Sequence, residues 1–528
     1  MNKNPTHTLY LITALLLLFC TVFFVGTTPS LADGDNAVVT YVDDDSCPGT
    51  GSGTPLDPYC KIQTAIDNAA AESEIRVAEG VYTGVQTITA TNSYTYTQVV
   101  FIDKSLTLRG GFDASNWAAP PDPLQKSSVI DAERSGRGIS AVGSGSESVT
   151  IDGFTITGGD YTDLGNPDGI YNQPVCRRTG FDCGGGLFAY YIELDLLNSY
   201  IIDNFGSTPE SDRNSDGGGV YFYDTRHGSS IENTVVISNT ASGPHGEGGG
   251  IKIVAGFDIT ISNIVFKNNT ASDQGGGLVI DDPNLLVTIS STNFYHNTAK
   301  NIGGAIKASI SAGGTALRMD RIRMVDNQAN IDGTSMYLRR VGSEGEVEAE
   351  FTNMLFAGSH SRSDNAAANV FKIIQWGPLE VTLNHITAAG NQAETFLEAQ
   401  TDNDLIDVLE IYLNNTLLQS FTNGFVASEV PDGELTIQHT NTLFDNVTNQ
   451  EVTAQGSPTF TANDPLTGSA KLDSSYHLIS GSDAIEAGVN AGVEFDIDGD
   501  TRDVDTPDIG ADEYLPRIYT PMIFKLAD

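Results

Sequence analysis

Three acid–base side chains lie close to glycine-rich segments of the chain. Asp224 and Asp282 each stand seven residues after the first glycine of a GGG cluster, and His245 lies in the segment between them. Two carboxylates that flank a glycosidic bond act as general acid and as general base or nucleophile. These three residues are therefore candidates for catalysis, and the alternative is that they are ordinary surface groups of an acidic chain.

A second candidate site lies near the C-terminus, in DIDGDTRDVDTPD at 496–508. Its alternating aspartates offer the oxygen ligands that Ca²⁺ requires: Asp496, Asp498, Asp500, Asp503 and Asp505. The segment is no EF-hand loop, which needs glycine at its sixth place, whereas Gly499 is fourth. In the alternative interpretation Arg502 neutralises the carboxylates, and Asp508 and Glu513 close a structural turn.

A third group of residues suits carbohydrate recognition. Side chains alternate between the two faces of a strand, so four aromatics that flank apolar positions are predicted to face outward: Phe188, Tyr190, Tyr221 and Tyr223. On neighbouring strands they would stand about 5 Å apart and form a flat surface with polar tips. Arg177 and Arg178 lie nearby in sequence. The alternative is that the long segment 158–183 folds over the aromatics and buries them.

The cysteines outside the apolar N-terminal segment form two close pairs, Cys47 with Cys60 and Cys176 with Cys183. Local pairing in an exported chain predicts two disulfides that staple loops. Zinc binding is the alternative, but the chain has no CxxC motif and no histidine beside these cysteines.

The N-terminus is typical of an export signal. Lys3 is the only charged residue before Asp33, residues 11–26 are uninterruptedly apolar, and Ser30 and Ala32 are small residues suited to cleavage. We therefore expect a secreted or cell-surface protein that starts near Asp33, with an uncleaved membrane anchor as the alternative. We expect no further membrane span, because no later stretch approaches 18 apolar residues.

The net charge limits the partners of the chain. The formal charge is −41, from 68 acidic and 27 basic residues. Such a surface repels phosphate backbones and anionic lipids, so we expect no nucleic-acid partner.

The elements that must position all these residues form a repeat. GGG occurs at 184–186, 217–219, 248–250 and 275–277, and GGA and GTS follow at 303–305 and 333–335. Similar phrases precede the later clusters, as in VVISNTA (235–241) and VFKNNTA (265–271). Such recurrence at about 30 residues is the signature of a repeat architecture.

The residues within each unit alternate with a period of two, which predicts strands. One inward position recurs after each cluster, occupied by Leu187, Val220, Ile251, Leu278, Ile306 and Met336. About three short strands per unit, stacked roughly 4.8 Å apart, make a parallel β-helix. A propeller blade would need about 40–45 residues. The recurring Asn239, Asn269, Asn297 and Asn327 predict a turn with left-handed φ and stacked amides.

These motifs carry a resemblance to known families. GGG-L/V/I with F-x-x-N, as in 266–269 and 294–297, resembles the repeat of chlamydial polymorphic outer-membrane proteins and the wider pectate-lyase-like right-handed parallel β-helix superfamily. This resemblance is clear over about 150–345 and continues more weakly to 448. Residues 39–84 resemble the N-terminal opening of secreted bacterial β-helix proteins, where a helix (here about 62–71) caps the first coil. Residues 480–514 resemble the choice-of-anchor Q domain.

The resemblance implies an all-β, right-handed parallel β-helix with an N-terminal helix cap and a C-terminal cap. The predicted layout is a signal peptide (1–32), an N-terminal cap with first coils (33–135), repeats (136–448), last coils with a choice-of-anchor Q-like cap (449–514) and a tail (515–528). Caps are needed because an open solenoid end exposes unpaired edges and apolar surface.

Function is predicted from the surface of this solenoid. The insertions before the glycine clusters become shorter along the chain, from 158–183 to 300–302, and stacked in register they would form a tapering shelf. Insertions on one face of a solenoid often mark its binding face. Tolerated growth of loops explains the same pattern equally well. Asp224 and Asp282 would stand two coils apart, about 10 Å, which is wide for an inverting pair. The NTD, GHG and RIK patterns of pectin hydrolases are absent. We therefore expect non-catalytic binding of polysaccharide or another surface polymer. The alternatives are a pectin-type lyase or glycoside hydrolase, and a structural stalk.

Overall fold

The computed structural model describes residues 38–166, 175–226, 228–254, 256, 258–281, 286–311, 316–342, 345–361, 368–402 and 408–515. The chain divides into two units, 1–37 and 38–528, and every described residue belongs to the second. The predicted signal peptide, Asp282 and residues 516–528 lie outside the described residues. In the described ranges no helix is both long enough and apolar enough to span a bilayer.

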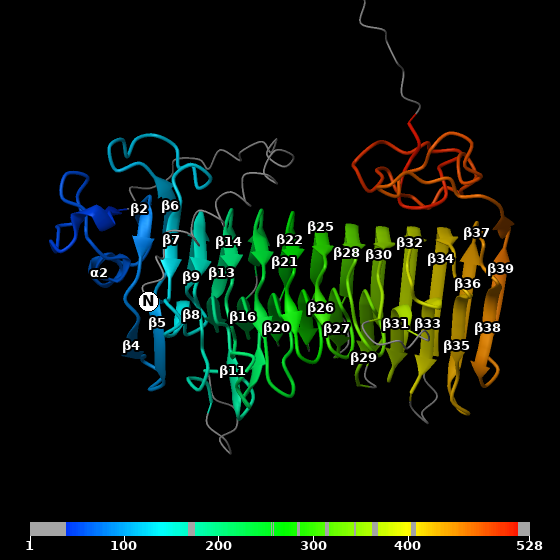
Figure 1. The fold of residues 1–528 in the computed structure, drawn as a ribbon, viewed down its shortest axis with the longest axis horizontal. Helices are drawn as coiled ribbons and strands as arrows, with labels where there is room; N and C mark the ends of the chain where they lie inside the picture. Colours follow the sequence, from blue (N-terminus) through cyan, green and yellow to red (C-terminus); the bar gives the residue numbers. More distant parts are fainter. Residues whose placement is uncertain are drawn as a thin grey trace, which may run out of the picture. The chain divides into compact units, whose positions relative to one another are not determined.

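The described chain is a parallel β-helix, as the sequence predicted, with strands stacked coil upon coil (Figure 1). One sheet has 13 strands. They are β4 (Gln86–Thr89), β5 (Thr95–Ile102), β8 (Arg137–Val142), β12 (Leu187–Tyr190), β16 (Val220–Tyr223), β20 (Ile251–Val254), β24 (Leu278–Asp281), β27 (Ile306–Ile310), β29 (Met336–Arg340), β31 (Asn369–Gln375), β33 (Thr395–Thr401), β35 (Asn423–Ser428) and β38 (Asn449–Gln455).

A second sheet has 22 strands and receives two runs of strands from many coils. They are β1 (Val39–Val42), β2 (Ser73–Ala78), β3 (Gly80–Tyr82), β6 (Leu106–Phe112), β7 (Ser128–Asp131), β9 (Ser148–Asp152), β10 (Phe154–Thr157), β13 (Glu193–Leu197), β14 (Tyr200–Ile202), β17 (Ser229–Glu232), β18 (Val235–Ile237), β21 (Ile259–Ser262), β22 (Val265–Lys267), β25 (Val287–Tyr295), β28 (Ala316–Val325), β30 (Val347–Ala357), β32 (Leu379–Ala389), β34 (Val408–Gln419), β36 (Glu434–Thr440), β37 (Leu443–Asp445), β39 (Thr459–Asn463) and β40 (Leu466–Thr467).

Two short sheets and two short helices complete the described elements. They are β19 (Thr240–Ala241), β23 (Thr270–Ala271) and β26 (Thr298–Ala299), then β11 (Phe181–Cys183) and β15 (Asn214–Asp216), then the 3₁₀ helix η1 (Asp44–Ser46) and α2 (Ile62–Asn68). The predicted N-terminal helix is therefore present, and it ends three residues earlier than expected. Its Ile62, Ala65 and Ile66 are buried in the main core.

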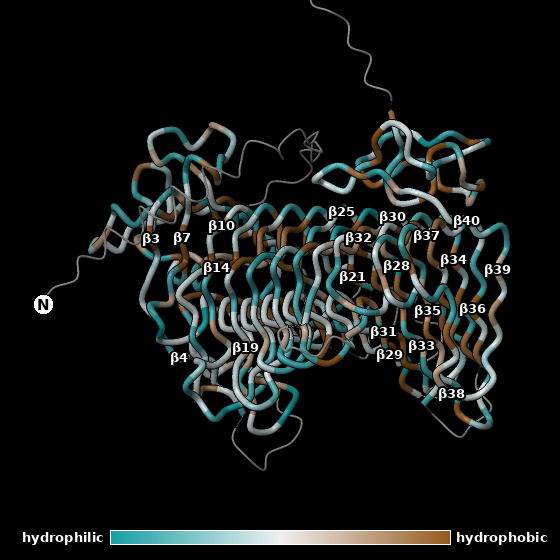
Figure 2. Tube along the Cα trace, turned by 45° about the vertical axis from the view of Figure 1, so that its right-hand side comes forward, coloured by the Kyte–Doolittle hydropathy of each residue, from teal (hydrophilic) through white to brown (hydrophobic). Residues whose placement is uncertain are grey.

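The register of the coils follows the inward apolar positions. Leu187 pairs with Val220, Val220 with Ile251 and Ile251 with Leu278, and the series continues to Met336. All of these side chains are buried, and apolar residues recur at matching places on successive coils (Figure 2). The period-two alternation therefore fixes which side of each strand faces the interior.

The recurring asparagines form a buried ladder, as predicted. The Nδ2 of each donates to the Oδ1 of the next, from Asn204 through Asn239, Asn269 and Asn297 to Asn327, at 2.9–3.1 Å. The prediction of a left-handed φ at these asparagines was wrong. The positive φ belongs to the preceding residue, for example 53° at Asn268, and the ladder asparagines themselves have no positive φ.

The glycine clusters mark places where backbones approach closely. Gly275 has a φ of +61°, and a Cβ on Gly276 would lie 2.4 Å from the carbonyl oxygen of Gly304 on the next coil. Side chains are therefore excluded from this bend, as the sequence indicated.

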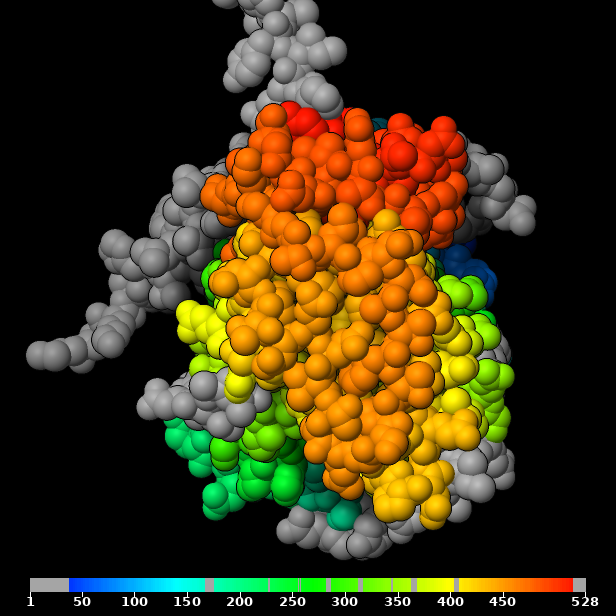
Figure 3. Space-filling view, turned by 90° about the vertical axis from the view of Figure 1, so that its right-hand side faces the viewer, coloured from blue at the N-terminus to red at the C-terminus, as the bar shows by residue number. Residues whose placement is uncertain are grey.

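The C-terminal segment does not cover the end of the stack, contrary to the expected cap. Its residues bond to the sides of the coils, with Phe495 O accepting from Asn353, Gly510 O contacting His385 and Val489 O accepting from Asn415. Figure 3 shows the last strands facing outward below this segment. The last strand of the 13-stranded sheet, β38, has the sequence NQEVTAQ and is largely exposed. Its mostly polar residues limit the apolar surface at this open edge.

His385 on β32 links the coils to this segment and gives a pH prediction. Burial, with the nearby Arg502, lowers the pKa of His385 to about 3. The unfolded chain takes up this proton near pH 6.5 while the folded chain does not, so the stabilisation from neutral His385 is complete above pH 6.5 and is lost as the pH falls towards 3.

We expect the unfolding temperature of the wild-type chain to fall more steeply between pH 7 and 5 than that of His385→Asn, which cannot titrate and accepts the φ of 57°. The exposed His296→Gln serves as control and should keep the wild-type slope. Equal slopes in the wild-type chain and in His385→Asn would contradict this role of His385.

Candidate functional site

The outward positions of the 13-stranded sheet form a column across successive coils. Phe188 pairs with Tyr221, Tyr221 with Lys252, Lys252 with Val279 and Val279 with Lys307. The alternation of each strand sends these side chains away from the main core. They divide into an aromatic part on β12 and β16 and a charged part on β20 to β27.

The aromatic part is more covered than the predicted platform. Phe188 and Tyr221 are fully buried in a second apolar cluster with Tyr161, Val175 and the disulfide-bonded cysteines 176 and 183. The guanidinium of Arg137 lies between Tyr161 and Phe188, 3.4 and 4.3 Å from the two ring centres. The expectation that Phe188 and Tyr221 are exposed is therefore wrong, and the alternative that segment 158–183 covers them is correct.

Two of the predicted aromatics remain partly exposed. Tyr190 and Tyr223 are half-buried neighbours on β12 and β16, with ring centres 5.2 Å apart. Tyr191 lies 5.9 Å from Tyr190, and Arg226 stands 3.8 Å over its ring. Burial raises the pKa of Tyr190 and of Tyr223, with Arg177 partly opposing this at Tyr223. The hydroxyls therefore remain protonated and available as hydrogen-bond donors.

The charged part is a buried ionic cluster centred on Lys252. The Nζ of Lys252 lies 2.9 Å from Asp216, 2.5 Å from Glu247 and 3.4 Å from Asp281. Its side chain is 1% exposed. We call Asp216, Glu247, Lys252, Asp281, Lys307 and Arg178 the ionic cluster.

Two further cations complete the ionic cluster. Lys307 pairs with Asp281, and Arg178 from the disulfide loop lies 2.8 Å from Glu247 and 3.8 Å from Asp281. Three carboxylates on adjacent coils thus face three cations. A buried pair persists only where partners compensate for lost hydration, and the cluster meets this condition.

Burial and charge oppose each other at the three carboxylates. Burial raises the pKa of Asp216 despite Lys252 and Arg178. At Asp281 burial is outweighed by Lys307 and Lys252, which lower its pKa, and at Glu247 it is outweighed by Lys252 and Arg178. The pKa values of Asp216 and Asp281 are therefore shifted in opposite directions.

The acid–base candidates from the sequence do not enter this cluster. Asp224 is half-buried, and burial raises its pKa. His245 has a side chain 65% exposed and lies 3.3 Å from Asp273. Asp282 lies outside the described residues, and its neighbour Asp281 takes part in the cluster instead. The Asp224–Asp282 pair therefore stays a prediction.

The sequence contains a signal for the ionic cluster. Asp216 and Glu247 each stand directly before a glycine cluster and pair with each other as neighbouring bridge residues. Lysine follows the inward apolar residue at 252 and 307. An acidic residue before the glycines and a lysine five residues later, as at 247 and 252, places opposite charges together on one coil.

Two of the C-terminal aspartates, Asp496 and Asp503, hold backbone groups of their own segment. Asp496 is fully buried and accepts backbone N–H groups of Asp498, Asp500 and Glu513. Asp503 accepts those of Asp505 and Thr506. Arg502 donates to Glu513 at 3.1 Å. Of the five predicted Ca²⁺ ligands only Asp498 joins a group of at least three metal-type donors within the described chain.

Both predicted disulfides are present. Cys47 bonds Cys60, and Cys176 bonds Cys183. The second closes the loop that covers Phe188 and brings Arg178 to the ionic cluster. The four sulfurs are consequently not available as zinc ligands.

Comparisons with known proteins give structural similarities only. No family model matches the chain, and no curated protein matches it. The chain is similar to pectate lyase Pel9A, at 13% identity and a TM-score of 0.35, over 91% of this chain and 97% of that one. It is also similar to the catalytic domain of a GH87 alpha-1,3-glucanase variant in complex with tetrasaccharides, at 14% identity and a TM-score of 0.33, over 83% of this chain and 70% of that one. A third similar structure is a Family 28 exopolygalacturonase of Yersinia enterocolitica, at 12% identity and a TM-score of 0.26, over 82% of this chain and 79% of that one.

Proposed function

We propose that this protein is exported and binds an extended polysaccharide without cleaving it, along the outer face of β12 and β16. The observation that carries the proposal is the pair of half-buried tyrosines, Tyr190 and Tyr223, with ring centres 5.2 Å apart. Aromatic rings with an apolar body and a polar tip suit sugars, which present C–H faces and hydroxyl edges.

The surroundings of this tyrosine pair favour a ligand that carries some negative charge. Arg226 stacks on Tyr191 beside the pair, and Arg177 acts electrostatically on Tyr223. These are concentrations of positive charge in a chain with a formal charge of −41. An acidic polysaccharide would meet complementary charge there and repulsion elsewhere, which favours binding at this face.

Export is supported by the cysteine chemistry. Disulfides persist in oxidising compartments outside the cytoplasm, and two are formed here. They agree with the apolar, signal-like N-terminal segment of the sequence.

The absence of cleavage is inferred from the state of the nearby carboxylates. Asp216, Glu247 and Asp281 are buried and each lies against lysine or arginine. A glycosidase carboxylate must reach the scissile oxygen or a water beside the sugar. Groups closed off in this way suit a supporting role beside the binding face.

A lyase or hydrolase is the second candidate, favoured by one observation. The pKa of Asp216 is raised and that of Asp281 lowered within one cluster, and such divergence is typical of acid and base roles. This alternative predicts release of cleaved sugar that Asp281→Asn abolishes.

The binding proposal predicts a loss of affinity in Tyr190→Ala/Tyr223→Ala. Two aromatic contacts of about 0.5–1.5 kcal/mol each amount to about 1–3 kcal/mol, which corresponds to roughly five- to 150-fold weaker association. Retention of the purified protein in gels containing pectins, alginate or neutral glucans measures this, and the same incubations are assayed for released reducing ends and unsaturated products.

The control is Tyr412→Ala, which removes a partly exposed tyrosine from β34 of the other sheet. We expect retention on at least one acidic polysaccharide, its loss in the double variant only, and no product. Unchanged retention in the double variant would refute the tyrosine site, and product release that Asp281→Asn abolishes would establish the enzymatic alternative.

A further inference from the structure

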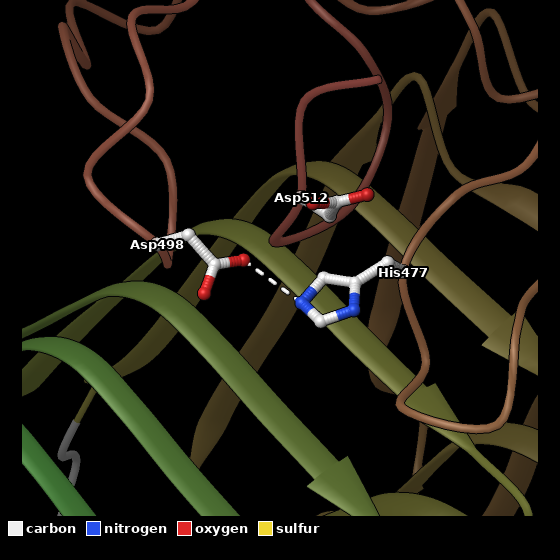
Figure 4. A group of neighbouring side chains, drawn as sticks. All are labelled: His477, Asp498 and Asp512. Atoms are coloured by element: carbon white, nitrogen blue, oxygen red, sulfur yellow. Dashed lines mark ion pairs between the residues drawn. The ribbon is translucent and has the colours of Figure 1, made fainter. Parts of the chain in front are cut away.

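Three metal-type donors meet in the C-terminal segment, away from the proposed sugar-binding face. His477, Asp498 and Asp512 each offer one ligand atom, and these atoms all lie within 4.8 Å of one another. The three residues come from separate stretches of chain and lie next to one another (Figure 4).

Asp512 is a buried carboxylate that faces this group. The residue is 8% exposed, and its Oδ2 accepts the backbone N–H of Leu478 at 2.6 Å. No other hydrogen-bond donor among the described residues contacts its side chain. A buried carboxylate with a single backbone partner either stays protonated or pairs with a positive charge, and a cation at this point would supply that charge.

Asp496 holds two of the three stretches in place. Its Oδ1 accepts the N–H groups of Asp498 and Asp500, and its Oδ2 accepts that of Glu513, next to Asp512. One buried side chain thereby fixes the backbone on both sides of the donor group. Such support is what orients metal ligands in proteins.

There is also space beside the donors. A small cavity of about 10 Å³ is lined by residues that include His477, Asp512, Tyr476 and Arg323. This is close to the smallest volume that holds one water-sized particle. The side chains of His477 and Asp498 are each 36% exposed, so an ion can enter from solvent.

We propose that His477, Asp498 and Asp512 form a binding site for a divalent transition-metal ion, with one imidazole nitrogen and two carboxylate oxygens as ligands. Zinc accepts this donor set at about 2.0–2.2 Å, and three protein ligands leave one position for water. Ligand atoms around such an ion lie at most about 4 Å apart, so the side chains must close by roughly 1 Å.

The present contacts can convert directly to coordination. The Nε2 of His477 donates to the Oδ2 of Asp498 at 2.8 Å, and Arg323 of β28 donates to the other oxygen, Oδ1. A bound ion would take the place of the Nε2 proton, which leaves to solvent. Arg323 would continue to orient Asp498 through Oδ1.

The imidazole distinguishes this site from the Ca²⁺ site predicted from the aspartates alone. Calcium prefers six to eight oxygen ligands, whereas nitrogen donors favour zinc, nickel or copper. The site should therefore select zinc over calcium.

The test is a titration of the full mature chain, freed of metals with a chelator, with ZnCl₂ and separately with CaCl₂. Calorimetry should show one zinc per chain, and a thermal-shift assay should show a higher unfolding temperature with zinc and none with calcium. We expect zinc to bind at least tenfold more weakly to His477→Gln and to the isosteric Asp512→Asn. His296→Gln removes a surface histidine 3.8 Å from a single aspartate and should bind zinc as the wild-type chain does.

Three outcomes would overturn the proposal. They are the absence of saturable zinc binding up to 1 mM (about the weak limit of a specific site), binding that survives in both ligand variants, and stabilisation by calcium equal to that by zinc. If one variant fails to fold, the other decides, and cobalt added to the wild-type chain gives an independent visible spectrum of the coordinated ion. The sugar-binding proposal does not depend on this result.

Discussion

Replacing Lys252 by methionine should lower the free energy of unfolding by about 3–5 kcal/mol at pH 7. Methionine fills similar space but removes the cation that lies within 3.4 Å of three carboxylates. Lys307 and Arg178 cannot compensate for all three, so negative charge stays buried without sufficient partners. Denaturant unfolding followed by circular dichroism measures the change.

The matched control is Lys300→Met, on an exposed lysine close to the glycine cluster at 303–305. It removes the same charge from the surface and should change stability by less than about 0.5 kcal/mol. If Lys252→Met were as mild as this control, the cluster would contribute little to the fold.

The second large effect is expected in Asn269→Leu. Asn269 accepts the backbone N–H and the Nδ2 of Asn239 and donates to Val236 O and to the Oδ1 of Asn297, all buried. Leucine leaves the backbone N–H of Asn239 without its acceptor and removes one hydrogen bond each from the Nδ2 of Asn239, Val236 O and the Oδ1 of Asn297. Since an unsatisfied buried group costs about 1–3 kcal/mol and each lost hydrogen bond adds to that cost, we expect a loss of at least about 3 kcal/mol.

The preceding residue provides the control for this variant. Asn268 is exposed and has a φ of 53°, which glycine adopts readily. Asn268→Gly should unfold within about 1 kcal/mol of the wild-type chain in the same denaturant titration. Similar losses in both variants would mean that the turn, and not the amide ladder, stabilises the coils.

The repeat could be predicted from the sequence because it depends on local alternation. Leu187, Val220 and Ile251 occupy one inward position, and the pairing of β12, β16 and β20 follows from it. At each asparagine the sequence predicted the stacked amide correctly but assigned the left-handed φ to the wrong residue. The residue with positive φ precedes the asparagine and is exposed, so it varies among Ser238, Asn268 and His296 and gives no sequence signal.

The candidate site was harder to predict because it depends on how one loop packs. Phe188 and Tyr221 face away from the main core, as expected, yet the disulfide loop covers them. The same loop brings Arg178 to Glu247, which is 69 residues away in the chain. Periodicity assigns a side chain to a face but does not show what a distant segment places upon that face.

The asparagine ladder has a direction. Each bond runs from a donor amide in one coil to an acceptor in the next, from Asn204 to Asn327. Bonds aligned in this way polarise one another and strengthen the row. Each internal asparagine accepts one amide bond from the coil before it and donates one to the coil after it. A whole coil can therefore be duplicated or deleted, and the flanking asparagines can still form the same hydrogen bond. The ladder is therefore compatible with duplication of repeat units in the gene, because no single contact in it depends on the number of coils.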